Sequence, residues 1–95
     1  MEKLLVIPTY NERENIASII DAVFTLSGYH VLIIDDNSPD GTAAIVRAMF
    51  DRYPERLFLE ERKGKLGLGT AYIHGFRWAL YRGYHFIFEM DADFS

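Results

Sequence analysis

The chain has 95 residues, of which 49% are hydrophobic and 25% are charged, and its formal net charge is -4. This length suits one domain, residues 1–95, and the scattered basic residues argue against a nucleic-acid partner, because duplex binding needs a clustered basic face. The absence of cysteine excludes a disulfide framework and a thiolate metal site.

Segments with two kinds of hydrophobic periodicity alternate along the chain. Continuous apolar runs, which are typical of buried strands, predict strands at residues 3–8, 30–36, 56–61 and 85–91. Apolar residues at helical spacing predict helices at residues 11–26, between residue 42 and Pro54, and at residues 70–83. Asn11 and Glu14 resemble a capping box, which would begin the first helix close to Asn11.

This alternation favours an α/β fold with a parallel sheet and right-handed crossovers. In the common doubly wound arrangement about four strands would lie in the order 3-2-1-4, with helices on both faces. Ligands of such sheets bind outside the carboxyl ends of the strands, at the point where the strand order reverses. Here that point falls between the first strand and the fourth.

The exit of the first strand carries Pro8, Tyr10 and Glu12. Pro8 marks the end of the strand because proline cannot donate to a sheet ladder. Tyr10 would pack against a base or sugar ring and Glu12 would hydrogen-bond to one. The alternative is structural: Tyr10 packs at the edge of the core, and Glu12 is a residue of the first helical turn favoured by the helix dipole.

Two adjacent carboxylates, Asp35 and Asp36, follow the second strand. Because neighbours on a strand face opposite ways, we expect only one of them to reach a ligand. A carboxylate there would accept hydrogen bonds from a base or a ribose. Asp40 is expected either to cap the second helix or to shape the turn before it.

Residues 62–69, RKGKLGLG, form a glycine-rich segment after the third strand. The spacing matches neither a Walker A motif nor the G-x-G-x-x-G fingerprint. Two interpretations remain open: a loop with a solvated basic cluster, or a flap that carries Lys63 and Lys65 over a diphosphate.

The fourth strand leads into Asp91 and Asp93, separated by Ala92. Residues i and i+2 of an extended segment point to the same side, so the two carboxylates repel unless a cation neutralises them. Hard cations such as Mg²⁺ or Mn²⁺ prefer oxygen ligands. At the exit of a buried strand, this pattern favours a metal site over a solvated acidic turn.

Four motifs occur in the order seen in the dolichyl-phosphate (polyprenyl-phosphate) mannosyltransferases: PTYNERENI, IIDDNSPDGT, GKLGLGTAYIHG and MDADFS. The chain resembles this family of inverting transferases, which belong to glycosyltransferase family 2 and have a Rossmann-like GT-A fold. The likeness runs from the first predicted strand to Ser95.

The resemblance implies a role for each matching residue. Asp91 and Asp93 would be the catalytic residues that ligate Mg²⁺ or Mn²⁺. The remaining residues would contact the nucleotide-sugar: Pro8, Tyr10 and Glu12 in the pocket wall, Ile34 and Asp36 at the base, Ala92 beside the donor and Lys65 at the diphosphate.

The resemblance also implies an activity, the metal-dependent transfer of mannose from GDP-mannose to a polyprenyl phosphate. The full-length protein would be cytoplasmic and face the membrane. Because family members continue well beyond the D-x-D motif, we expect residues 1–95 to be the amino-terminal, donor-binding part of a GT-A domain. Alone, it would be inactive and would lack the membrane-associating regions. The fourth strand (Phe86, Ile87, Phe88) would be an apolar edge open to self-association.

Three alternatives differ in chemistry. The first keeps the fold and uses UDP-glucose or another nucleotide-sugar. The second is a haloacid-dehalogenase-type phosphatase, whose nucleophile strand FEMDADFS resembles, although that motif normally opens the domain. The third is a non-catalytic nucleotide-binding module.

Overall fold

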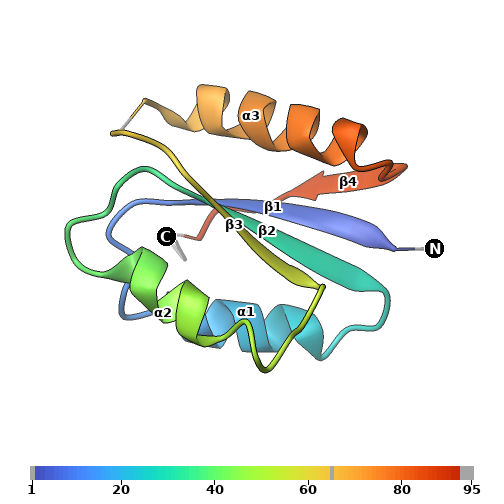
Figure 1. Cartoon of the computed structure of the whole chain (residues 1–95), viewed down its shortest axis with the longest axis horizontal. Helices are drawn as coiled ribbons and strands as arrows, with labels where there is room; N and C mark the ends of the chain where they lie inside the picture. The colour runs from blue at the N-terminus through green and yellow to red at the C-terminus, as the bar shows by residue number, and fades with distance from the viewer. Residues whose placement is uncertain (1, 65, 93–95) are drawn as a thin grey trace.

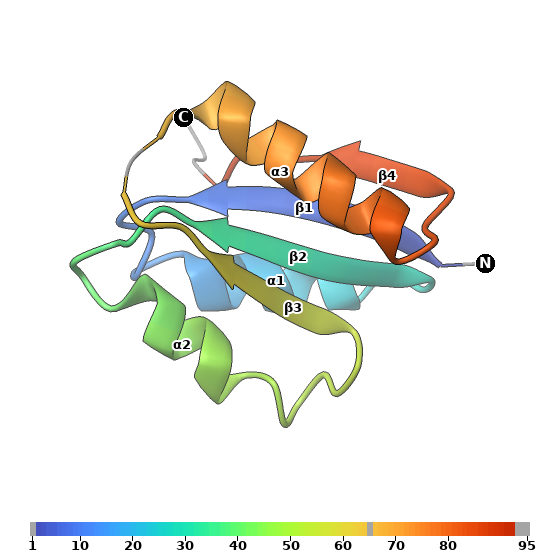
Figure 2. The same ribbon diagram turned by 45° about the horizontal axis from the view of Figure 1, so that its top comes forward.

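The computed structural model describes residues 2–64 and 66–92. Its strands, all paired in parallel, are β1 (Lys3–Thr9), β2 (Tyr29–Asp35), β3 (Leu57–Glu61) and β4 (Phe86–Glu89), and its helices are α1 (Ile16–Phe24), α2 (Thr42–Ala48) and α3 (Leu68–Tyr81). The strand order is β3-β2-β1-β4 (Figures 1 and 2), which confirms the predicted topology.

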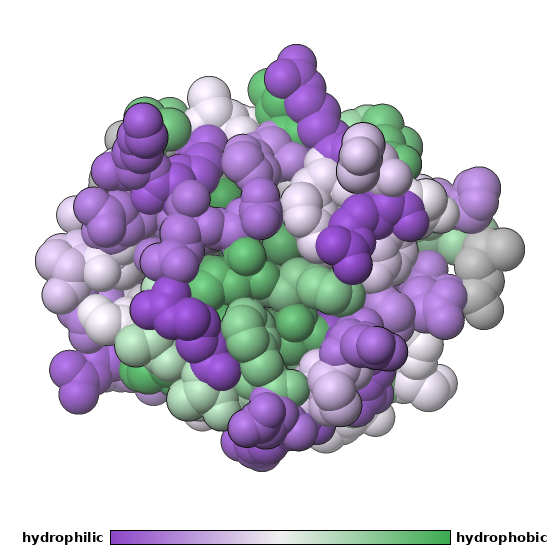
Figure 3. All heavy atoms as spheres, viewed as in Figure 1, coloured by the Kyte–Doolittle hydropathy of each residue, from purple (hydrophilic) through white to green (hydrophobic). Residues whose placement is uncertain are grey.

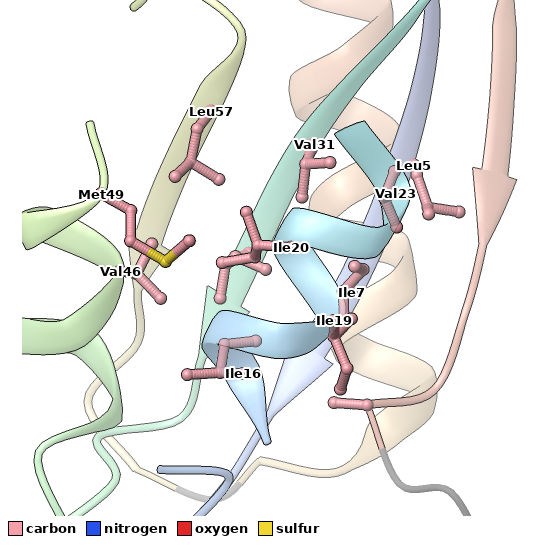
Figure 4. Packing of buried hydrophobic residues seen from close by; sticks show 12 residues of the cluster. Leu5, Ile7, Ile16, Ile19, Ile20, Val23, Val31, Val46, Met49 and Leu57 are labelled. Atoms are coloured by element: carbon pink, nitrogen blue, oxygen red, sulfur yellow. The ribbon is translucent and has the colours of Figure 1, made fainter. Parts of the chain in front are cut away.

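Helices cover both faces of the sheet, as predicted. Helices α1 and α2 lie on one face and α3 lies on the other (Figure 1). Because successive strand residues point to opposite faces, β1, β2 and β3 each contribute to two apolar clusters. On the α1 and α2 face, Leu5, Ile7, Val31 and Ile33 pack with helix residues such as Ile20 and Val46 (Figure 4). On the α3 face, the cluster consists of Leu4, Val6, Leu32, Ile34, Ala71 and Ala79.

The predicted capping box of the first helix is wrong. Helix α1 begins at Ile16, and its N-cap residue, Asn15, makes no side-chain capping bond. Asn11 has a φ of 56°, outside the helical region. The main-chain N–H of Asn11 donates instead to the hydroxyl of Ser38, in the loop after β2, at 2.9 Å. That of Glu12 donates to the hydroxyl of Thr42, the first residue of α2, at 3.0 Å. The segment after β1 is therefore bound to the loop after β2 and to the start of α2.

Helix α2 is also shorter than predicted, since it ends at Ala48. The chain then continues in turns up to β3, and Tyr53 in these turns lies against α1. The rings of Tyr53 and Phe24 stack with their centroids 4.1 Å apart, and the Tyr53 hydroxyl donates to Asp21. Tyr53 is therefore tied to α1 and does not extend α2.

Helix α3 lies very close to the sheet at Gly75. A Cβ atom at this position would lie 2.5 Å from Cγ1 of Val6, a buried residue of β1. Glycine in a helix interior normally costs about 1 kcal/mol relative to alanine. The close approach of helix and strand is a physical reason for accepting that cost.

We therefore expect Gly75→Ala to destabilise the chain, although alanine is the better helix former. Overpacking of this kind costs about 1–3 kcal/mol, which exceeds the gain in helix propensity. Urea unfolding measures the difference. Gly69→Ala in the same helix is the matched control, because a Cβ there meets nothing within 4 Å. Equal stability of the two variants would contradict the proposed contact.

The strand β4 lies at an edge of the sheet and pairs with β1 alone among the described strands. Phe86 and Phe88 are 49% and 43% exposed, so the edge is apolar and open, as predicted. Self-association through it stays a prediction. The opposite edge strand, β3, is drawn in front of β2 and β1 in Figure 1, and Figure 3 shows a hydrophobic area in the middle of the same view. None of the described helices has the length and apolar character needed to cross a bilayer.

Candidate functional site

A pocket of about 290 Å³ opens at the carboxyl end of the sheet. It spans the exits of β1, β2 and β4 and the start of α3, so it lies where the strand order reverses, as the sequence predicted. The residues that line it are Pro8, Thr9, Tyr10, Glu12, Asp36, Gly67, Leu68, Ala71, Asp91 and Ala92.

The two aspartates after β2 have different environments. Asp35 is buried and accepts hydrogen bonds from the hydroxyls of Thr9 and Ser38, both at 2.7 Å, and from the main-chain N–H of Ser38 at 3.0 Å. Its carboxylate therefore joins the ends of β1 and β2. Asp36 lines the pocket instead. Of the two aspartates only Asp36 is among the lining residues, and its contact with a ligand stays a prediction.

Asp40 shapes the turn before α2, which is one of its two predicted roles, whereas the N-cap residue of α2 is Gly41. Its Oδ1 accepts from the main-chain N–H of Thr42 at 3.0 Å, and its Oδ2 accepts from that of Arg13 at 3.1 Å. Burial raises the pKa of Asp40. These two hydrogen bonds and one from the Thr42 hydroxyl lower it by more, so the net shift of the pKa is downward. The carboxylate thus stays charged and ties the loop after β1 to the loop after β2.

Asp36 forms a two-bond ion pair with Arg62, which follows β3. Arg62 Nε lies 2.6 Å from Asp36 Oδ1 and Arg62 Nη2 lies 2.8 Å from Asp36 Oδ2. The side chains of Asp36 and Arg62 are only 9% and 7% exposed. The main-chain N–H of Leu66 also donates to Asp36 Oδ2. The pair therefore fixes the first part of the glycine-rich segment against the exit of β2.

Arg62 holds the start of α3 as well. It donates to the hydroxyl of Thr70 at 3.0 Å and to the main-chain carbonyl of Gly67 at 3.2 Å. Sequence reasoning counted Arg62 only as part of a basic cluster. In the sheet Asp35 pairs with Glu61, so the next residues, Asp36 and Arg62, leave neighbouring strands side by side. This register comes from the structure, and no pattern in the sequence indicated it. At least this basic residue of the segment has a structural role.

Asp91 lies at the other side of the pocket and is exposed. The hydroxyl of Tyr72, a residue of α3, donates to Asp91 Oδ1 at 2.6 Å. Burial of Tyr72, together with this hydrogen bond and the charge of Asp91, raises the pKa of Tyr72, so its hydroxyl remains a donor at neutral pH. Sequence reasoning missed Tyr72, because nothing local in the sequence connects it with Asp91.

The structure brings most of the predicted site residues together. Pro8, Tyr10, Glu12, Asp36, Asp91 and Ala92 all line the pocket. Ile34 does not, since its side chain is fully buried in the cluster under α3. Asp93 and Lys65 lie outside the described residues. Pocket residues that the sequence did not single out are Thr9, Gly67, Leu68 and Ala71.

The donor set fits a hard cation in a limited way. Asp91 offers a carboxylate in the pocket, and Mg²⁺ is often held by one or two carboxylates together with substrate phosphates. Among residues 2–64 and 66–92 no group of three metal-ligating side chains comes together. A cation here would therefore depend on Asp91, on the predicted ligand Asp93 and on the phosphates of a ligand.

Sequence comparison identifies the family of the chain. Residues 4–95 match the family described as glycosyl transferase family 2. A polyprenol monophosphomannose synthase of Mycolicibacterium smegmatis is 47% identical over 93 residues, which cover 97% of this chain and 35% of that protein. An undecaprenyl-phosphate mannosyltransferase of Micrococcus luteus is 46% identical, with 100% of this chain and 39% of that protein covered. The chain thus spans little more than a third of the length of these curated relatives.

Solved structures show the same arrangement. The mannosyltransferase PcManGT from Pyrobaculum calidifontis, solved in complex with GDP-Man and Mn²⁺, superposes with a TM-score of 0.76 at 28% identity over 82% of this chain and 24% of that one. TarS from S. aureus superposes with a TM-score of 0.77 at 22% identity over 98% of this chain and 17% of that one, a likeness of fold alone.

Proposed function

The chain belongs to glycosyl transferase family 2, and from this premise we propose that its pocket binds the nucleotide-sugar donor GDP-mannose. The whole protein would transfer mannose to a polyprenyl phosphate with inversion at the sugar carbon. The observation that carries the proposal is the meeting of Asp36 and Asp91 in one pocket at the switch point of the sheet. The two mannosyltransferase-type relatives and the GDP-Man complex of PcManGT support the choice of donor and acceptor.

Each of the pocket residues would contact a different part of the donor. Tyr10 presents a partly exposed ring for a base or ribose, and Glu12 and Asp36 present carboxylate acceptors for their N–H and O–H groups. The two-bond ion pair with Arg62 holds the carboxylate of Asp36 in place beside the pocket. Ala92 is small and buried at the pocket floor, so the donor would pass close to the main chain there.

Asp91 and Asp93 would be the catalytic residues, as ligands of Mg²⁺ or Mn²⁺. When bound, this ion supplies charge stabilisation for the diphosphate that leaves the sugar. The acceptor phosphate is already largely anionic near neutral pH, by analogy with other phosphate esters, so it needs little help from a general base. Lys65, which belongs to the glycine-rich segment, would screen the negative charge of the diphosphate.

Family membership favours the transferase over the phosphatase and the non-catalytic module considered from the sequence. Since the acceptor would be a lipid, the protein would act at a membrane surface, and we place this on the cytoplasmic side. The 95 residues span 35% and 39% of the two relatives, so from this chain alone we expect donor binding and no turnover.

Calorimetric titration of the chain with GDP-mannose and with UDP-glucose, each with Mn²⁺ and with EDTA, tests the proposal. We expect binding of GDP-mannose that requires Mn²⁺ and weaker binding of UDP-glucose. Preference for UDP-glucose would keep the site and overturn the mannosyl donor. Binding that is unchanged by EDTA would overturn the metal assignment.

A further inference from the structure

A side chain of α3 holds the carboxylate that the proposed function places at the metal. The Tyr72 hydroxyl lies 2.6 Å from Asp91 Oδ1, although the two residues are 19 positions apart in the sequence. Asp91 itself is exposed and comes just after the end of β4. An exposed aspartate would otherwise be free to change rotamer. The contact therefore supplies a constraint that the local chain does not.

The donor is itself well fixed. The side chain of Tyr72 is partly buried and packs against the apolar cluster between α3 and the sheet, which includes Leu4, Val6 and Ile34. The glycine at position 75 sets the distance of this helix from β1. A hydroxyl on a packed ring of a packed helix has little freedom, so the hydrogen bond fixes Asp91 rather than Tyr72.

We propose that Tyr72 is a positioning residue for Asp91: it holds Oδ1 in place so that Oδ2 is directed to the cation and diphosphate of the donor. This inference rests on the proposed function, since it takes Asp91 to be the residue that meets the metal. Outer-shell partners of this kind orient ligating carboxylates before the metal arrives.

The chain contains a matched control for this hydrogen bond. The hydroxyl of Tyr53 donates to Asp21 Oδ1 at 2.5 Å, so it forms the same kind of bond between the same residue types. Neither residue lines the pocket, and Asp21 is also paired with Arg52 at 2.9 Å. Tyr72→Phe and Tyr53→Phe each remove one hydroxyl and keep the ring. Both variants should fold, which urea unfolding checks.

The first measurement uses the metal-free protein. Three-bond NMR couplings between the Asp91 side-chain carboxyl carbon and its main-chain atoms report the χ1 rotamer. We expect one dominant Asp91 rotamer in the wild type and in Tyr53→Phe, and averaged couplings in Tyr72→Phe. A single Asp91 rotamer in Tyr72→Phe, or averaging already in the wild type, would overturn the inference.

The second measurement is calorimetric binding of Mn²⁺ in the presence of GDP. Loss of an outer-shell partner typically weakens metal affinity by about 10–100-fold, and we expect that loss in Tyr72→Phe and none in Tyr53→Phe. Equal affinity of Tyr72→Phe and wild type would overturn the role of Tyr72. Failure of the wild type to bind would count against the proposed function instead, and the rotamer measurement would still decide the role of Tyr72.

Discussion

Asp91→Asn is expected to abolish the Mn²⁺-dependent binding of GDP-mannose while leaving the chain folded. Asparagine keeps an acceptor for the Tyr72 hydroxyl and loses the negative charge that a hard cation requires. The loss of affinity should exceed the ~10–100-fold effect of removing an outer-shell partner, because the group removed is the ligand itself. Since Asp91 is exposed, the free energy of unfolding should fall by no more than about 1 kcal/mol.

Titration calorimetry measures the first effect and urea unfolding the second. Asp51→Asn is the control, because it also removes one carboxylate charge, from an exposed turn that does not line the pocket. It should bind the donor as the wild type does. If Asp91→Asn retained metal-dependent binding, Asp91 would not be the metal ligand, and a site built on other residues would be needed.

Arg62→Met is expected to cause the largest loss of stability. The substitution keeps most of the volume of the side chain but leaves the carboxylate of Asp36 buried without its cation. Breaking a buried ion pair from one side typically costs about 3–5 kcal/mol. The ties from Arg62 to Thr70 and Gly67 are lost as well, so the start of α3 should become less ordered. Urea unfolding monitored by circular dichroism measures the difference.

A second arginine in the chain offers a control with the same chemistry on the surface. Arg47 Nη1 lies 2.6 Å from Glu61 Oε2, with the two side chains 50% and 51% exposed. Exposed pairs contribute about 0–1 kcal/mol, so Arg47→Met should change stability little. The double variant Asp36→Leu with Arg62→Met should recover part of the loss, because an apolar pair leaves no buried charge. Equal effects of Arg47→Met and Arg62→Met would contradict the importance of burial.

The topology could be predicted from the sequence because it follows from patterns that are local. Continuous apolar runs identify strands buried on both faces, and their alternation with helical segments requires parallel crossovers. The site was predictable for the same reason. Polar residues directly after a strand, such as Tyr10 and Asp36, must lie at the carboxyl edge of the sheet.

What the sequence did not predict depends on contacts between distant residues. The pairing of Asp36 with Arg62 and of Asp91 with Tyr72 joins loops through side chains and has no periodic signal. Ile34 shows a limit of a different kind. Ile34 faces the same side of the sheet as Asp36. Because it lies two residues before Asp36, within β2, its side chain is covered by α3 and does not reach the pocket. Alternation along a strand predicts which face of the sheet a side chain lies on, but not whether that side chain reaches the pocket or is buried under a helix.

The contact between Gly75 and Val6 has a consequence for how the family can vary. Position 75 sets how near α3 comes to the sheet, and Tyr72 on that helix reaches Asp91. A larger residue at position 75 would require a smaller one at position 6, or the hydroxyl would be carried away from the carboxylate. Positions 6 and 75 should therefore change together in related sequences. Selection on the pocket would then limit which residues are tolerated at these two core positions, although neither of them lines the pocket.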